Sequence, residues 1–122
     1  MIVTVLIPLP LFYNADEHGK REPIMEQHFE RTAEEITEIF HGGGTLSIFR
    51  DGQVRGFWWD RGAVDRDTHA LLEFDIEDSS VNRGIVRAWA REVLKERFRQ
   101  KAMYVKWIGP VETWVVSDEK VE

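Results

Sequence analysis

Ionisable side chains alternate with apolar ones between positions 68 and 77. His69, Glu73, Asp75 and Glu77 all occupy odd positions, so in a β-strand they share one face. Carboxylates about 7 Å apart along a strand can share a divalent ion or raise one another's pKa, and a nearby histidine can move a proton. The candidate catalytic residues are therefore His69, Glu73 and Asp75.

The same residues also suit a solvated strand face whose charges pair with cations on neighbouring strands. Arg50, Arg55 and Lys106 lie in segments that could supply those cations. The sequence contains no HExxH pattern and no histidine-rich run, so we expect no metal site. We favour the solvated-face interpretation over catalysis.

The second feature that could take part in binding or chemistry is a surplus of aromatic residues. Trp58 and Trp59 are adjacent, so in a strand they must face opposite sides; we expect one in the core and the other on the outer face. The aromatic set is Phe57, Trp58, Trp59, Tyr104, Trp107 and Trp114. Such a surplus indicates either an apolar pocket or partner surface, or a large core around a small sheet. The candidate ligand-binding residues are Arg55, Trp59, Tyr104 and Lys106.

The last two features that could form a binding site are a row of basic residues and a run of glycines. Arg83, Arg87, Arg91 and Lys95 repeat every four residues, which puts them on one helix face. That row could contact an anion or RNA phosphate, but we interpret it as a solvated face. Residues 42–44 are glycines that follow a helical pattern rather than a strand, so they indicate a helix stop and not a phosphate loop.

These residues must be positioned by alternating strands and helices. Apolar patterns predict strands at 2–11, 45–49, 54–60, 68–77 and 102–108, a short final strand at 111–116, and helices at 24–40 and 81–101. Asp51-Gly52 predicts a hairpin between the second and third strands. Residues 61–67 are expected to form a polar loop, Gly109-Pro110 to break the last strand, and Asp78-Ser79-Ser80 to cap the second helix.

Each helix carries one apolar stripe. The first stripe is Met25, Phe29, Ala33, Ile36 and Ile39 or Phe40; the second is Val81, Ile85, Ala88, Trp89, Val93 and Phe98. A helix with one stripe packs on one surface, so both helices should cover the same sheet face. The first helix is acidic and the second basic, so we also expect them to attract each other side by side.

The order β-α-β-β-β-α-β contains the split βαβ pattern with an extra hairpin strand. It predicts an α+β ferredoxin-like sandwich, βαββαβ, with two helices on one face of an antiparallel sheet. In architecture the order also resembles the protomer of the dimeric α+β barrel proteins. We expect one domain at 1–116 and a polar tail at 117–122.

The amino-acid composition excludes some classes of protein function. The chain has 122 residues, 43% of them hydrophobic, a net charge of −6 and no cysteine. The absence of cysteine excludes disulfides and thiolate chemistry and agrees with a cytoplasmic location. The acidic balance argues against binding to nucleic acid or to anionic membranes, and the apolar start lacks the pattern of a signal peptide.

The sequence contains no motif that fixes a reaction or a cofactor. We expect a small soluble binding domain that forms a homodimer through its sheet face, where a small-molecule ligand could also be held. One alternative is a small enzyme that uses acid–base groups on the open sheet face. Another is an accessory or regulatory subunit that binds a partner protein.

Overall fold

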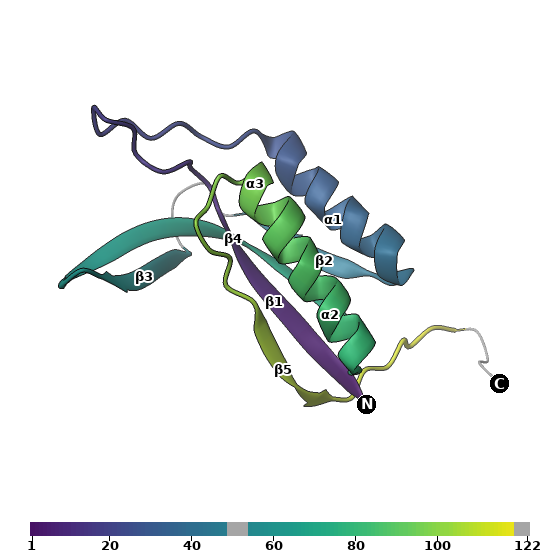
Figure 1. The fold of residues 1–122 in the computed structure, drawn as a ribbon. Helices are drawn as coiled ribbons and strands as arrows, with labels where there is room; N and C mark the ends of the chain where they lie inside the picture. Colours follow the sequence, from purple (N-terminus) through teal and green to yellow (C-terminus); the bar gives the residue numbers. More distant parts are fainter. Residues whose placement is uncertain (49–53, 119–122) are drawn as a thin grey trace.

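The computed structural model describes residues 1–48 and 54–118. Its elements follow the predicted order (Figure 1). They are β1 (Ile2–Pro10), α1 (Glu26–Phe40), β2 (Gly44–Ser47), β3 (Arg55–Asp60), β4 (Ala63–Glu77), α2 (Ser80–Trp89), a π-helix η1 (Ala90–Leu94), α3 (Lys95–Arg97) and β5 (Lys106–Val111).

One antiparallel sheet has the order β2-β4-β1-β5, with β3 paired to β4 beside β2. In its centre, β1 and β4 pair over the whole length of β1, from Ile2 opposite Glu77 to Pro10 opposite His69. Both helices lie on the same side of this sheet (Figure 1). The predicted ferredoxin-like α+β sandwich is therefore confirmed.

The core lies between the helices and the sheet. Val5, Ile7 and Leu9 of β1 are completely buried, as are Ala70 and Leu72 of β4. The helices contribute Phe29, Thr32, Ile36, Val86, Trp89, Ala90 and Leu94 to this interior, and Phe98 follows directly after α3. None of the helices in the described residues lies on the opposite face of the sheet, and we call it the open face.

The first helix keeps most of its predicted stripe. Phe29 and Ile36 are buried, whereas Met25 precedes the helix and is 57% exposed. The helix ends at His41, whose φ of 54° is left-handed. A histidine, and not the glycine predicted from residues 42–44, therefore makes the turn out of the helix.

The second helix is capped as expected, because Ser79 Oγ accepts a hydrogen bond of 3.1 Å from the Asn82 backbone N–H. Its buried face differs from the predicted stripe. Val81 and Ile85 are exposed, and Val86, Ala90 and Leu94 are buried instead. The π-helix at Ala90–Leu94 explains part of the difference, because its wider turn changes the helical phase.

The predicted hairpin between β2 and β3 is wrong. Both strands pair antiparallel with β4, β2 at residues 71–74 and β3 at 63–68, so they run in the same direction along one edge. Asp51-Gly52, on which the prediction was based, lies outside the described residues. The real hairpin joins β3 to β4 through Arg61 and Gly62, whose φ values of 49° and 85° suit a two-residue turn. The predicted loop at 61–67 is therefore mostly strand.

The last strand also differs from its prediction. It starts at Lys106 rather than at Ala102 and continues through Gly109-Pro110 to Val111. Proline is tolerated there because β5 lies at an edge of the sheet. Residues 112–116 form no strand.

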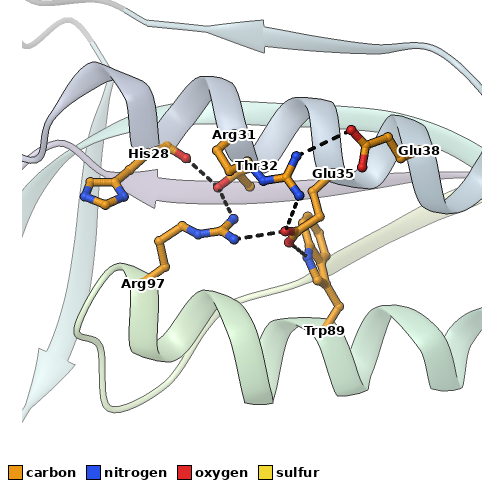
Figure 2. A network of polar contacts seen from close by, with 7 residues as sticks. All are labelled: His28, Arg31, Thr32, Glu35, Glu38, Trp89 and Arg97. Atoms are coloured by element: carbon orange, nitrogen blue, oxygen red, sulfur yellow. Dashed lines mark hydrogen bonds and ion pairs between the residues drawn. The ribbon is translucent and has the colours of Figure 1, made fainter.

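A polar network joins the two helices (Figure 2). The Glu35 carboxylate accepts hydrogen bonds from Trp89 Nε1 at 2.5 Å and from the Arg97 guanidinium at 3.0 Å. Arg97 also donates to Thr32 Oγ1 at 2.9 Å, and Thr32 donates to the His28 carbonyl at 2.7 Å. The predicted attraction between the acidic and basic helices is thus realised at one partly buried carboxylate.

The pKa of Glu35 reflects two opposing effects. Burial raises it, but the hydrogen bonds from Trp89 and Arg97 and the charges of Arg97 and Arg31 together lower the pKa below its usual value. The stabilisation is therefore complete above the pKa of an unfolded glutamate, about 4.3. It is lost as the pH falls through the lower pKa of the folded state.

We expect Glu35→Ala to lower the free energy of unfolding by about 1–3 kcal/mol, because the donors on Trp89 and Arg97, both in partly buried hydrogen bonds, lose an acceptor. Urea unfolding at neutral pH measures this loss. Glu34→Ala is the matched control: Glu34 is exposed on the same helix, and its removal should change stability by less than about 0.5 kcal/mol. Equal effects of the two substitutions would contradict the role assigned to the network.

Candidate functional site

The hairpin of β3 and the first half of β4 extends away from the body of the protein (Figure 1). Residues 63–68 pair with β3, whereas β1 pairs only with residues 69–77 of β4. We call residues 55–68 the arm. It is a two-stranded ribbon, and none of the helices in residues 1–48 and 54–118 lies over it.

One face of the arm is apolar and exposed. Trp59 pairs with Val64 across the hairpin; Trp59 is 76% exposed, Phe57 59% and Val64 48%. The guanidinium of Arg66 lies 5.8 Å from the centre of the Phe57 ring. By the two-residue period of β4, this face continues the side of the sheet that the helices cover elsewhere. We call it the uncovered face of the arm.

The other face of the arm carries an aromatic cluster around His69. The Trp58 ring lies 5.8 Å from the His69 ring and 5.7 Å from the Tyr104 ring. Gly56 leaves the space that the imidazole occupies, since a Cβ at this position would lie 2.1 Å from His69 Cε1. His69 is consequently only 7% exposed, although it belongs to the open face of the sheet.

The surroundings of His69 favour its neutral form. Burial lowers the pKa of His69, and the nearby Asp67 carboxylate, 3.8 Å from Nε2, opposes that shift only in part. Asp67 is shared with other partners: it accepts hydrogen bonds of 3.2 Å from Arg21 and 2.8 Å from the Thr68 backbone N–H. The imidazole therefore packs in its neutral form against Trp58 at the base of the arm.

The structure separates the candidate catalytic residues. Glu73 lies four residues from His69 on the same strand, roughly 13 Å away at the usual rise per residue. Both Glu73 and Asp75 are exposed, and Asp75 accepts a hydrogen bond of 2.5 Å from Thr4 Oγ1. His69 and the two carboxylates do not converge on one reacting atom.

The candidate ligand-binding residues are also divided. By strand register, Arg55 and Trp59 lie on the uncovered face of the arm, and Tyr104 contacts Trp58 on the other face. Lys106 lies on the open face, with Leu6 between it and Glu73. Arg50, the other cation expected there, lies outside the described residues.

A cavity of about 400 Å³ lies at the base of the arm. It is lined by Phe12, Arg21, Arg55, Arg66, Asp67 and Thr68. Of the candidate ligand-binding residues predicted from the sequence, Arg55 belongs to this lining. The cavity combines several guanidinium groups with one carboxylate, which suits a small polar or anionic group.

The expectation that one of the adjacent tryptophans enters the core is wrong. Trp58 is 39% exposed and Trp59 is 76% exposed, because the arm projects beyond the helices. The burial of His69 was likewise not predicted. The signal available was Gly56, whose lack of a side chain in a strand indicates close approach by another group.

The described residues contain neither a metal-binding cluster nor a membrane-spanning helix. Within residues 1–48 and 54–118, no three His, Asp or Glu side chains gather closely enough to hold a metal ion. No helix in this part of the chain is both long and apolar enough to span a bilayer.

We expect His69 to titrate below the ordinary histidine pKa of about 6.5, measured by NMR with His69→Gln to assign its signals. Because protonation is favoured in the unfolded chain, stability should fall as the pH drops below that value. The His69→Gln variant should lose this part of the pH dependence. A His69 pKa above 6.5 would show that the imidazole is not buried as described.

Comparison with known proteins supports the fold. No protein-family model and no curated protein matches the chain. Among solved structures, the chain is similar to the divalent cation tolerance protein (Cut A1) from Thermus thermophilus. The match has a TM-score of 0.59 and 14% sequence identity, and it covers 93% of this chain and 87% of that chain. At this identity the similarity concerns the fold, and it agrees with the ferredoxin-like architecture.

Proposed function

We propose that this protein is a binding domain that assembles with copies of itself, with the uncovered face of the arm as the contact surface. The observation that carries the proposal is the exposure of Phe57, Trp59 and Val64 side by side on a projecting hairpin. Contiguous apolar surface of this kind is typical of interaction sites, and tryptophan is enriched among residues that dominate binding energy.

The stability of the arm supports the same proposal. An isolated two-stranded ribbon is marginally stable in water, and a third layer or a partner normally supports it. Trp59 stays 76% exposed and Phe57 59% exposed, although the guanidinium of Arg66 lies over the Phe57 ring. Burying this surface would contribute roughly 25 cal/mol per Å² of apolar area.

A second copy of the chain offers a complementary surface, namely the open face of its sheet. This face presents the partly exposed Leu6 and Ile108 beside the exposed carboxylates Glu73 and Asp75, although Lys106 also lies there. The uncovered face of the arm carries the cations Arg55 and Arg66 next to its aromatic residues. Apolar groups would meet apolar groups, and arginines would meet carboxylates.

The proposed contact joins two different surfaces, so it must close on itself to form a finite assembly. A homodimer in which each copy places its arm on the open face of the other is the smallest closed form. The cavity at the base of the arm would then border the contact, where Arg55 could hold a small anionic ligand. The name of the Thermus protein refers to divalent cation tolerance; our proposal depends on the arm and not on that name.

We expect Trp59→Ser to dissociate the assembly. Removing a central tryptophan commonly costs at least about 2 kcal/mol of binding free energy, so the dissociation constant should rise by roughly thirtyfold or more. Size-exclusion chromatography with light scattering measures the mass across micromolar concentrations. Circular dichroism confirms that the variant is folded.

Trp114→Ser is the matched control, because Trp114 is 78% exposed but lies outside the arm. It should leave the mass of the assembly unchanged. A wild-type protein that remains monomeric at micromolar concentration would overturn the proposal. An assembly that survives Trp59→Ser would show that a different surface forms the contact.

A further inference from the structure

A second cavity of about 400 Å³ lies at the opposite edge of the fold from the arm. Its lining residues come from α2, η1 and the start of α3 on one side, and from residues 101–105 and the start of β5 on the other. Figure 1 shows where these elements lie in the fold. Its lining residues are Arg87, Ala90, Arg91, Lys95, Lys101, Ala102, Met103, Val105 and Trp107. We call it the basic groove.

The charge of the groove is opposite to that of the protein. The chain has a net charge of −6, yet Arg87, Arg91, Lys95 and Lys101 line the groove and no Asp or Glu belongs to its lining. Arg91 pairs with the exposed Glu92 at 3.2 Å. The side chains of the other three cations have no hydrogen-bond or ion-pair partner among the residues that the structure describes. The groove is therefore an uncompensated positive site.

The helix geometry keeps these cations together. In a regular α-helix, residues four apart drift around the axis because each turn contains 3.6 residues. The π-helix at Ala90–Leu94 has more residues per turn. Within it, residues four apart drift around the helix axis in the opposite sense, which offsets the drift in the α-helix. Arg87, Arg91 and Lys95 consequently all reach the same groove. Single π-turns are frequent at functional sites.

The floor of the groove is apolar. Ala90, Met103, Val105 and Trp107 contribute carbon surface to its lining. Trp107 is fixed in place by Arg83, whose guanidinium lies 4.5 Å from the centre of an indole ring. Arg83 is itself held by Asp78 at 2.6 Å. An apolar floor beside a row of cations is suited to a ligand with a flat apolar body and several negative charges.

We propose that the basic groove binds an aromatic organic phosphate that carries at least two negative charges. Arginine recognises phosphate by paired hydrogen bonds, and the unpaired cations are placed to receive the phosphates while the apolar floor covers the ring. A cavity of this volume falls within the range of small-molecule sites. A simple inorganic anion would leave the floor uncovered, and the negative charge of the whole protein opposes a long nucleic acid.

Three probes test the proposal by isothermal titration calorimetry of the wild-type protein without divalent metal. ATP supplies both the aromatic body and the charges, tripolyphosphate supplies the charges alone, and adenosine supplies the body alone. ATP should bind with a dissociation constant below about 1 mM, and each of the other two should bind at least roughly tenfold more weakly.

Two double variants locate the site. Arg87→Gln with Lys101→Gln removes two unpaired cations of the groove and should weaken ATP binding by roughly tenfold or more. Lys20→Gln with Arg31→Gln removes the same charge outside the groove and should change the affinity by less than about twofold. Circular dichroism checks that both variants are folded.

Absence of ATP binding at 1 mM would overturn the proposal, as would equal affinity for ATP and tripolyphosphate. Equal losses in the two double variants would also overturn it, because they would show attraction to net charge alone. A change in molecular mass on removal of Arg87 and Lys101, without a change in ATP affinity, would assign the groove to a protein contact instead. The assembly through the arm is measured separately, so either proposal can fail alone.

Discussion

The length of β4 is the constraint on which the rest of the structure depends. This strand has fifteen residues, whereas its central partner β1 has nine. The second half of β4 therefore builds the sheet, and the first half must leave it with only β3 as a partner. The helices cover the sheet but do not reach this projecting part. The uncovered face of the arm is thus a direct consequence of the difference in length between β4 and β1.

The two ends of the molecule present different chemistry. At the arm, exposed aromatic residues and arginines suit a protein surface that offers apolar groups and carboxylates. At the opposite edge, the basic groove combines cations with an apolar floor and suits an aromatic phosphate. Between them, Glu35 of α1 accepts hydrogen bonds from Arg97 and Trp89, which holds the helices to each other. This separation allows assembly and ligand binding to be independent.

The element order and the side that the helices cover could be predicted, because they follow from the apolar period of each segment. The edge strands could not. Asp51-Gly52 is a strong local turn signal, but β2 pairs with β4 residues that are distant in sequence. β3 pairs with β4 through the turn at Arg61 and Gly62, in a segment whose polar residues predicted a loop. The separation of the candidate site residues was also not predicted. His69 is buried because Gly56 leaves room for its ring and Trp58 packs beside it, and both residues lie on the strand paired with β4. The buried face of the second helix was predicted incorrectly, in part because the apolar pattern was interpreted as an uninterrupted α-helix, whereas Ala90–Leu94 is a π-helix.

The central claim is that the arm of one copy lies on the open face of another. The most direct measurement is an isotope-filtered nuclear Overhauser experiment on a mixture of labelled and unlabelled protein, which detects only contacts between copies. Our account predicts contacts from the rings of Phe57 and Trp59 in one copy to the methyl groups of Leu6 and Ile108 in the other. Contacts between copies that omit both rings, or none at all at high concentration, would contradict it.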